Sequence, residues 1–450
     1  MAGKKGNTLT KTVWQHTEVL PEDTMNFLRG LAEGYGKIKN YTYKRYAGIK
    51  SFGRLTPVYD IMGEVRHSGI RTQLGLPSAC FDPAVVDAVS DIKSMWAVVK
   101  KKLGNLITVN ENLTDEERIY LRTILKLDKA YAAILNHEDY EMPKKAKDFD
   151  IDVERLNNLL RRLTRKYLRK PEAGCADYFS ITPAGYTYQD GVILITTGIH
   201  GKRMSIPLKD DRTSDRQLKI FVREKDAAIA IPVESRIKTH QDYTNTVFVH
   251  IGYKDMFTLS NGNVYGASLG DATAKETERL TEKNKERAKI RSVQKRSVET
   301  GDRKKAGNID VNNLGTLKYD HQKDKERVKT QIFINAEINR MLAAEKPERI
   351  VITRPVIVNR TKLPSKSANR KMTRNFNSYI RERLTYKCRM NSIELVEIHS
   401  KGTGNICSCC GAEGKRTASG FVCGNCGLQS TIAQNGAKNI ENKYKKMKSE

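Results

Sequence analysis

The sequence lacks long apolar segments and contains little proline. No run approaches the roughly 20 apolar residues that a membrane helix requires. The basic N-terminus, Met1 to Asn7, is not followed by the apolar core of a signal peptide. With 12 prolines among 450 residues, collagen-like and mucin-like proteins are excluded. We therefore expect a soluble, intracellular, cytoplasmic protein with no membrane partner.

Negative charge is also scarce. The chain has 52 Asp and Glu against 80 Lys and Arg, which gives a formal net charge of +28. A hydrophobic content of 38% is still enough to bury cores in two to four folding units. A basic surface kept for solubility alone is the alternative, but acidic residues usually serve that purpose better. The charge therefore predicts a polyanionic partner, with nucleic acid as the main candidate.

Cysteine is too unevenly distributed for a disulfide framework. Five of the eight cysteines lie within twenty residues. Two Cys-x2-Cys pairs, twelve residues apart and each followed by a glycine, have the spacing of a tetrahedral thiolate site. The predicted ligands of a structural Zn²⁺ are Cys407, Cys410, Cys423 and Cys426. Four thiolates leave the metal no open position for catalysis, and we expect Cys409 to be a free thiol.

The periodicity of apolar residues changes twice along the chain. Residues 17–170 are predicted to be mostly helical, and 176–238 contain short β-type runs that suggest a small antiparallel barrel, with 10–15 as its first strand. From residue 246 the expected order is hairpin, charged helices over 271–345, buried strand, helix and strand. This order fits an α/β layer of the ribonuclease H type.

The C-terminal motifs resemble a known family. The segment Arg383-Leu384-Thr385-Tyr386-Lys387-Cys388, the strand ending at Ile398, both cysteine pairs and Asn435 to Ile440 resemble the TnpB family. Its members are transposon-encoded RNA-guided nucleases, and compact type V CRISPR effectors are their relatives. The likeness is specific over about 245–450, and upstream only the general layout matches.

The resemblance implies a multidomain α+β protein. A helical recognition lobe is inserted in a wedge β-barrel, and an RNase H/RuvC-like α/β domain with an inserted zinc ribbon follows. The expected boundaries are 1–16 for the first wedge strand, 17–170 for the recognition lobe, 171–245 for the rest of the barrel, 246–400 for the RuvC-like domain with long basic helices at 271–345, 401–428 for the zinc ribbon, and 429–450 for the last RuvC-like helix and a basic tail.

The family cuts DNA with three carboxylates that hold two Mg²⁺ ions. At the matching positions this sequence has His250, Thr353 and Ala433, so all three carboxylates are missing. The resemblance therefore implies an inactive nuclease without catalytic Mg²⁺.

Other acids are poor substitutes for the missing ones. Asp255 and Glu348 lie five residues from the first two positions, which changes both depth and strand face. After Asp324 the chain has no aspartate, and Glu441 lies two helical turns past the third position.

The prediction from these residues is an RNA-guided DNA-binding protein that is not an enzyme. It would bind guide RNA and double-stranded target DNA in the bacterial nucleoid and act by occupancy as a transcriptional repressor. Two alternatives stay open: an active Mg²⁺-dependent endonuclease that uses displaced carboxylates, and an RNA-binding zinc protein with no DNA target. The sequence also leaves open whether a homodimer shares one guide.

Candidate nucleic-acid contacts combine cations with aromatic residues. Their alternative role is that of solvated helix faces with half-buried tyrosines. The candidates are Tyr41, Tyr43, Lys44, Arg45, Tyr46, Arg161, Arg165, Lys283, Lys285, Arg287, Lys289, Arg291 and Lys438.

Overall fold

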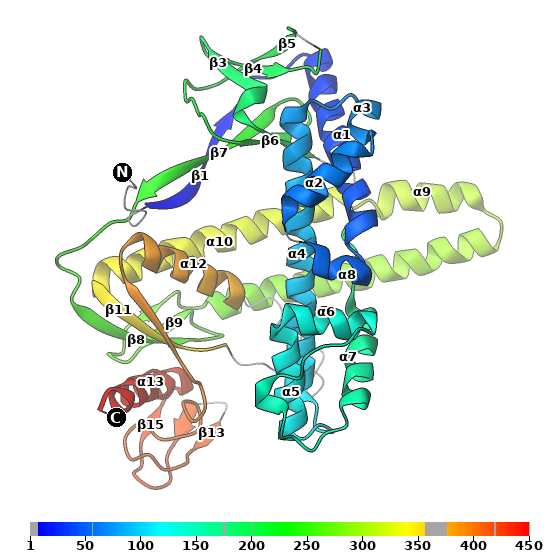
Figure 1. The fold of residues 1–450 in the computed structure, drawn as a ribbon. Helices are drawn as coiled ribbons and strands as arrows, with labels where there is room; N and C mark the ends of the chain where they lie inside the picture. The colour runs from blue at the N-terminus through cyan, green and yellow to red at the C-terminus, as the bar shows by residue number, and fades with distance from the viewer. Residues whose placement is uncertain are drawn as a thin grey trace, which may run out of the picture. The chain divides into compact units, whose positions relative to one another are not determined.

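The computed structural model describes residues 8–55, 57–173, 177–199, 201–355, 376–417 and 420–449. The chain divides into two compact units, Thr10–Ser235 and Arg236–Glu450 with Met1–Leu9 (Figure 1). We refer to them as the N-terminal and C-terminal units. Both contain helices and strands, so the predicted multidomain α+β organisation is confirmed. None of the described helices is apolar over a length that would cross a membrane.

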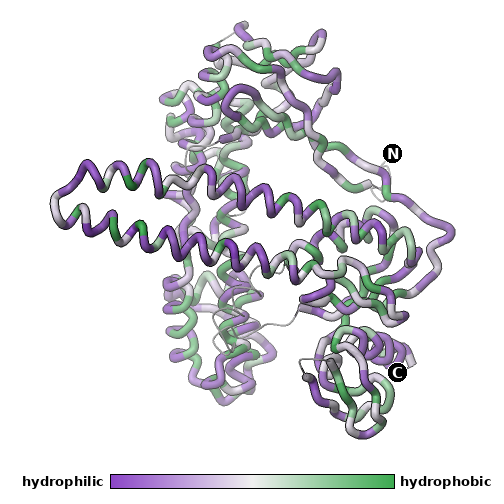
Figure 2. Tube along the Cα trace, turned by 180° about the vertical axis from the view of Figure 1, so that it is seen from behind, coloured by the Kyte–Doolittle hydropathy of each residue, from purple (hydrophilic) through white to green (hydrophobic). Residues whose placement is uncertain are grey.

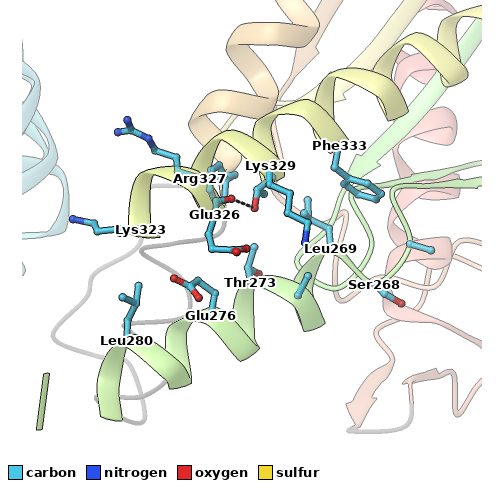
Figure 3. Close-up of a pocket in the computed structure, with 14 residues that line it drawn as sticks. Ser268, Leu269, Thr273, Glu276, Leu280, Lys323, Glu326, Arg327, Lys329 and Phe333 are labelled. Atoms are coloured by element: carbon cyan, nitrogen blue, oxygen red, sulfur yellow. Dashed lines mark hydrogen bonds between the residues drawn. The ribbon is translucent and has the colours of Figure 1, made fainter. Parts of the chain in front are cut away.

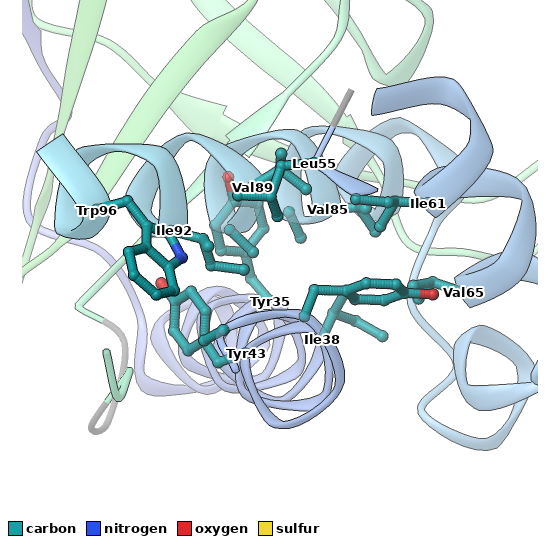
Figure 4. Packing of buried hydrophobic residues seen from close by; sticks show 14 of the residues in the cluster. Tyr35, Ile38, Tyr43, Leu55, Ile61, Val65, Val85, Val89, Ile92 and Trp96 are labelled. Atoms are coloured by element: carbon teal, nitrogen blue, oxygen red, sulfur yellow. The ribbon is translucent and has the colours of Figure 1, made fainter. Parts of the chain in front are cut away.

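Helices dominate the first part of the N-terminal unit. They are α1 (Glu22–Tyr46), α2 (Val58–His67), α3 (Ile70–Gln73), α4 (Ser78–Val109), α5 (Asp115–Lys126), α6 (Asp128–Asn136) and α7 (Val153–Tyr167). The Thr114 hydroxyl accepts the Glu117 N–H while the Glu117 carboxylate accepts the Thr114 N–H, which forms a capping box at the start of α5. Helices α1 and α4 share a core that includes Tyr35, Val89 and Trp96 (Figure 4).

The strands of this unit pair as two antiparallel sheets. The first has the order β1 (Thr8–His16), β7 (Ala227–Arg236), β6 (Leu218–Val222), β2 (Tyr178–Ile181). The second has the order β3 (Tyr186–Gln189), β4 (Val192–Thr196), β5 (Arg203–Pro207). Phe179, Ile193 and Ile220 are fully buried and belong to the same core as the helices. The pairing of the described strands does not show a closed barrel, so the wedge barrel stays a prediction.

The C-terminal unit is built on a five-stranded mixed sheet. Its order is β10 (Val264–Tyr265), β9 (Phe257–Leu259), β8 (Asn245–Ile251), β11 (Pro347–Thr353), β12 (Glu394–Ile398). Strands β8 to β10 pair antiparallel, whereas β11 runs parallel to both β8 and β12. A small ribbon of β13 (Lys415–Thr417), β14 (Gly420–Val422) and β15 (Gln429–Ser430) lies between β12 and the last helix.

Strand alternation gives the sheet two apolar faces. On one face Val249 and Ile352 pack with residues of α10 (Leu317–Glu345) and α12 (Asn377–Met390). On the other, Phe248 and Val351 pack against Ile440 of α13 (Ile432–Ser449). Helix α12 corresponds to the helix that the sequence predicts over residues 372–391. Of that range, 372–375 lie outside the described residues.

Two long helices leave the sheet. These are α8 (Leu269–Glu299) and α10, connected through α9 (Arg303–Asn313), and both are largely hydrophilic along their length (Figure 2). They occupy the 271–345 region, which the sequence predicted to be helical and charged.

Candidate functional site

Four cysteines form one compact cluster. The sulfur atoms of Cys407, Cys410, Cys423 and Cys426 all lie within 4.8 Å of one another. The Sγ–Sγ distances are 3.5 Å for Cys407–Cys426 and 3.6 Å for Cys410–Cys423. Zn–S bonds of about 2.3 Å in a tetrahedron place the sulfurs about 3.8 Å apart, so the cluster is consistent with a structural Zn²⁺.

Each cysteine pair sits on a tight turn. The Gly411 N–H donates to the Cys407 carbonyl at 3.0 Å, and the Gly427 N–H donates to the Cys423 carbonyl at 3.1 Å. Both glycines have positive φ angles, 77° and 72°, which residues with a side chain rarely adopt. The backbone therefore turns so that two sulfurs point to the same side. Cys409 is exposed and lies outside the cluster.

The cysteine ribbon is bound to α13 by two asparagines that sequence reasoning missed as structural residues. The buried Asn435 accepts the Ser408 N–H at 2.9 Å and donates to the Ile406 carbonyl at 2.8 Å. Asn439, one turn later, donates to the same carbonyl at 2.7 Å. Their i,i+4 spacing was the available signal, because it places both amides on one helix face. The ribbon and α13 therefore form a single hydrogen-bonded assembly.

His250 lies on β8, on the sheet face that α13 covers. A Cβ atom at Gly436 would stand only 3.0 Å from His250 Nδ1, so the imidazole packs directly against the α13 backbone. Burial lowers the pKa of His250, and the positive charge of Arg416 on β13 lowers it further. The imidazole is consequently neutral at neutral pH.

Thr353 and Ala433, the other two positions at which the resemblance calls for a carboxylate, lie near His250. In the parallel pair of β8 and β11, Ile352 is opposite Val249, so Thr353 follows at the level of His250 and on the same face. Ala433 lies one turn before Gly436, on the helix face that continues through the buried Ala437 and Ile440. The structure thus brings together the three positions that the sequence separates by up to 183 residues.

The nearby acids have other contacts. Asp255 accepts the Ser268 N–H at 3.1 Å, and Glu441 pairs with Lys445 at 2.7 Å. Glu348 lies at the start of β11, at the opposite end of the strand from Thr353. Within the described ranges, the cysteine cluster is the one group of three or more His, Cys, Asp or Glu residues with converging ligand atoms.

Two tyrosines predicted to contact nucleic acid are instead part of the α1 core. Tyr43 and Tyr46 are 4% and 3% exposed, and their hydroxyls donate to Asp91 and Glu64, respectively. Their burial corrects the expectation that they could stack on bases. Tyr41 is half-buried beneath the Arg45 guanidinium, at 5.0 Å from the ring centroid. Lys44 and Arg45 are exposed.

The predicted cations of α7 and α8 differ in their environments. Arg287 is buried and donates to the carbonyls of Leu314 and Gly315 at 2.7 and 3.0 Å, which corrects its prediction as a surface contact. Arg161 is half-buried and donates to the Ile134 carbonyl at 2.7 Å. The exposed candidates are Arg165, Lys283, Lys285, Lys289, Arg291 and Lys438.

The exposed cations of α8 do not share one face. Lys285 and Lys289 are four residues apart and lie side by side, on the helix side away from buried Arg287. Lys283 and Arg291 each lie four residues from Arg287 and flank it instead. Lys283 also pairs with Glu286 at 3.3 Å. Of the predicted α8 contacts, only Lys285 and Lys289 could therefore act on one partner from the outward face.

A groove of about 610 Å³ lies between α8 and α10 (Figure 3). Its lining includes the apolar residues Leu269, Leu280 and Phe333 and charged residues of both signs, among them Glu276 and Arg327. No pattern in the sequence predicted this groove.

Residues 378–440 match the family model described as Cas12f1-like, TNB domain. The matched segment contains α12, β12, the four cysteines and Ala433. No curated protein matches the sequence.

Three solved structures align with most of the chain at low sequence identity and with TM-scores below 0.5. The Cas12f1-sgRNA-target DNA complex is 13% identical over 97% of this chain and 99% of that chain, with a TM-score of 0.37. The mini-RNA-guided endonuclease CRISPR-Cas_phi3 is 11% identical over 97% and 92%, with a TM-score of 0.44. CasPhi-2 (Cas12j) bound to crRNA and phosphorothioate-DNA is 10% identical over 97% and 91%, with a TM-score of 0.43.

Proposed function

We propose that this protein is an RNA-guided DNA-binding protein of the TnpB-like and compact type V group, and that its RuvC-like domain no longer cuts DNA. The match of residues 378–440 to the Cas12f1-like TNB model supports the assignment, because it covers the cysteine ribbon and the start of α13. The sheet order β10-β9-β8-β11-β12, with three antiparallel strands followed by two parallel ones, has the arrangement of a ribonuclease H type layer.

One observation carries the proposal of inactivity. His250 and Thr353 lie near the C-terminal ends of β8 and β11, on the sheet face that α13 covers, and Ala433 lies on α13. The resemblance calls for a carboxylate at each of these positions. Two-metal hydrolysis needs anionic oxygens that bridge the cations and hold the attacking water. A neutral imidazole suits Mg²⁺ poorly, a threonine hydroxyl is a weak ligand, and alanine offers no ligand atom.

Other features of the chain suit binding of nucleic acid. The cysteine cluster has zinc geometry, its ribbon is hydrogen-bonded to α13, and the chain carries a net charge of +28. A protein that opens and holds a DNA duplex without cutting it blocks transcription by occupying the site. Repression by occupancy is therefore the activity that these residues favour.

Guide-dependent binding tests the proposal. The RNA that co-purifies with the full chain is sequenced, and affinity is measured for labelled duplexes that match the guide or a scrambled sequence. We expect the matched duplex to bind at least about tenfold more tightly, with affinity that falls steeply with salt. Equal affinities for both duplexes would contradict RNA-guided targeting.

The same assay separates the alternatives. Guide-programmed strand cleavage by the unmodified protein in Mg²⁺ would instead support an active endonuclease with displaced carboxylates. Bound RNA without binding of either duplex would support an RNA-binding zinc protein.

A further inference from the structure

A row of aromatic rings crosses the four-stranded sheet of the N-terminal unit. Trp14 on β1 lies 5.4 Å from Phe221 on β6, measured between ring centroids, and Phe221 lies 5.6 Å from Tyr178 on β2. The row continues to Tyr35 of α1, whose ring is 5.8 Å from that of Tyr178. The three ring pairs form one packed row, in which neighbouring rings are tilted by 55°, 38° and 59°.

A small residue allows rings from non-adjacent strands to meet. Strand β7 lies between β1 and β6, and Ala228 of β7 is opposite Phe221. Paired residues of antiparallel strands share a face, so the alanine methyl lies on the same side as the rings. Ala228 is fully buried. The rings of Trp14 and Phe221 can therefore meet above β7.

One end of this row is open. Trp14 is 47% exposed, although burying its indole would be worth more than burying most other side chains. Phe221 and Tyr178 are half-buried. The row thus runs from the buried core of α1 and α4 to an exposed indole, which is rigidly supported on its inner side by Phe221.

Cations stand around the rings, but acids nearly balance them. Lys219 Nζ lies 4.4 Å from the Tyr178 ring centroid and 3.5 Å from Asp87. The Arg212 guanidinium donates to the Trp14 carbonyl at 2.9 Å. We therefore expect a partner to bind here more through stacking on the rings than through ion pairs.

We propose that the Trp14–Phe221 surface stacks an unpaired nucleobase. The surface offers the exposed indole of Trp14, backed by the half-buried ring of Phe221, and a nucleobase can stack on such a ring face. The net charge of +28 brings polyanions to the chain, and stacking on aromatic side chains tolerates any base. The inference rests only on the nucleic-acid binding part of the proposed function, not on guide-directed targeting.

Tryptophan fluorescence tests the proposal, because the chain has two tryptophans and Trp96 is only 2% exposed. The full-length protein is titrated with 20-nucleotide oligo(U) and, in a second arm, oligo(dT). We expect quenching of Trp14 emission at saturation, protection of the indole from acrylamide, and loss of both signals in Trp14→Phe. Quenching by oligo(U), oligo(dT) or both would assign the base to RNA, DNA or either. Absence of quenching in both arms would overturn the proposal.

Affinity measurements add a second readout. Trp14→Ala should weaken oligonucleotide binding about fivefold or more, and Trp14→Phe should restore most of the affinity because a ring is retained. The factor should stay constant between low and moderate salt, whereas total affinity falls. Val19→Ala is the matched control, since Val19 is 69% exposed in the same unit but outside the row. An equal loss in Val19→Ala, or none in Trp14→Ala, would refute stacking at this surface.

Discussion

The imidazole of His250 is packed against the backbone of Gly436, where a Cβ atom would come within 3.0 Å of Nδ1. Strand β8 and helix α13 are therefore in close contact at the position where the resemblance calls for a metal-binding carboxylate. A side chain at 436 would crowd the imidazole, and the burial at this contact favours a neutral side chain at 250. The neutral imidazole and the close packing of the helix are therefore two parts of one arrangement.

The lowered pKa of His250 predicts a pH-dependent stability. Burial and the charge of Arg416 hold the folded-state pKa below the ordinary value of 6.5. Below about 6.5 the unfolded chain binds a proton that the folded chain resists, so the free energy of unfolding should fall as the pH drops. One such group contributes up to about 1.4 kcal/mol per pH unit.

Thermal unfolding at pH 7.5 and 5.5 measures this effect. His250→Gln should lose less stability than the wild type between the two pH values. His321→Gln, which replaces an exposed histidine, is the control and should behave like the wild type. Identical pH dependence in all three proteins would show that His250 titrates as freely as in an unfolded chain.

The cysteine cluster predicts that substitutions at the neighbouring residues Cys409 and Cys410 have different effects on zinc binding. Cys410→Ser removes one of four sulfurs, so bound zinc should fall from about one equivalent per chain to near zero, and the ribbon should unfold. Cys409→Ser should keep the metal and the melting temperature, because Cys409 is exposed and outside the cluster. Metal content by elemental analysis and differential scanning calorimetry provide the measurements. Zinc loss in Cys409→Ser as well would place its sulfur among the ligands.

The contrast between Cys410 and Tyr43 shows which features a sequence can reveal. Two Cys-x2-Cys pairs specify local turns and a metal, so short-range spacing is sufficient to predict the cluster. The register of the parallel strands β8 and β11 places Thr353 at the level of His250, and strand alternation places both on the same face. In contrast, Tyr43 is buried, and its hydroxyl donates to Asp91 of α4, 48 residues away. No local pattern specifies that contact, since its partner comes from another helix.

Arg287 illustrates the same limit and gives a prediction. Its guanidinium donates to two carbonyls at the end of α9, Leu314 and Gly315. Arg287→Met keeps the length of the side chain but leaves these acceptors without their donor, so it should lower the free energy of unfolding by roughly 1–3 kcal/mol. Lys289→Met on the exposed side of α8 should change it by less than about 0.5 kcal/mol. Urea denaturation compares the two, and equal effects would contradict a structural role for Arg287.

The missing carboxylates predict that cleavage can be restored. His250→Asp, Thr353→Glu and Ala433→Asp together place three anionic ligands where α13 covers the C-terminal ends of β8 and β11. Their oxygens would hold two Mg²⁺ ions there, so guide-programmed nicking of a supercoiled plasmid should appear in Mg²⁺ and disappear with EDTA. Variants with only two of the three changes should stay inactive, because a metal pair needs bridging from all three elements.

The decisive control for this experiment carries the same shapes without charge. His250→Asn, Thr353→Gln and Ala433→Asn should bind the matched duplex as the acidic triple variant does but should not nick it. If the acidic variant folds, binds guide and target, and still leaves the plasmid intact, the loss of activity involves more than three side chains. Close packing of α13 on β8 at Gly436 would then be the next constraint to relieve, because the helix backbone occupies the space beside position 250.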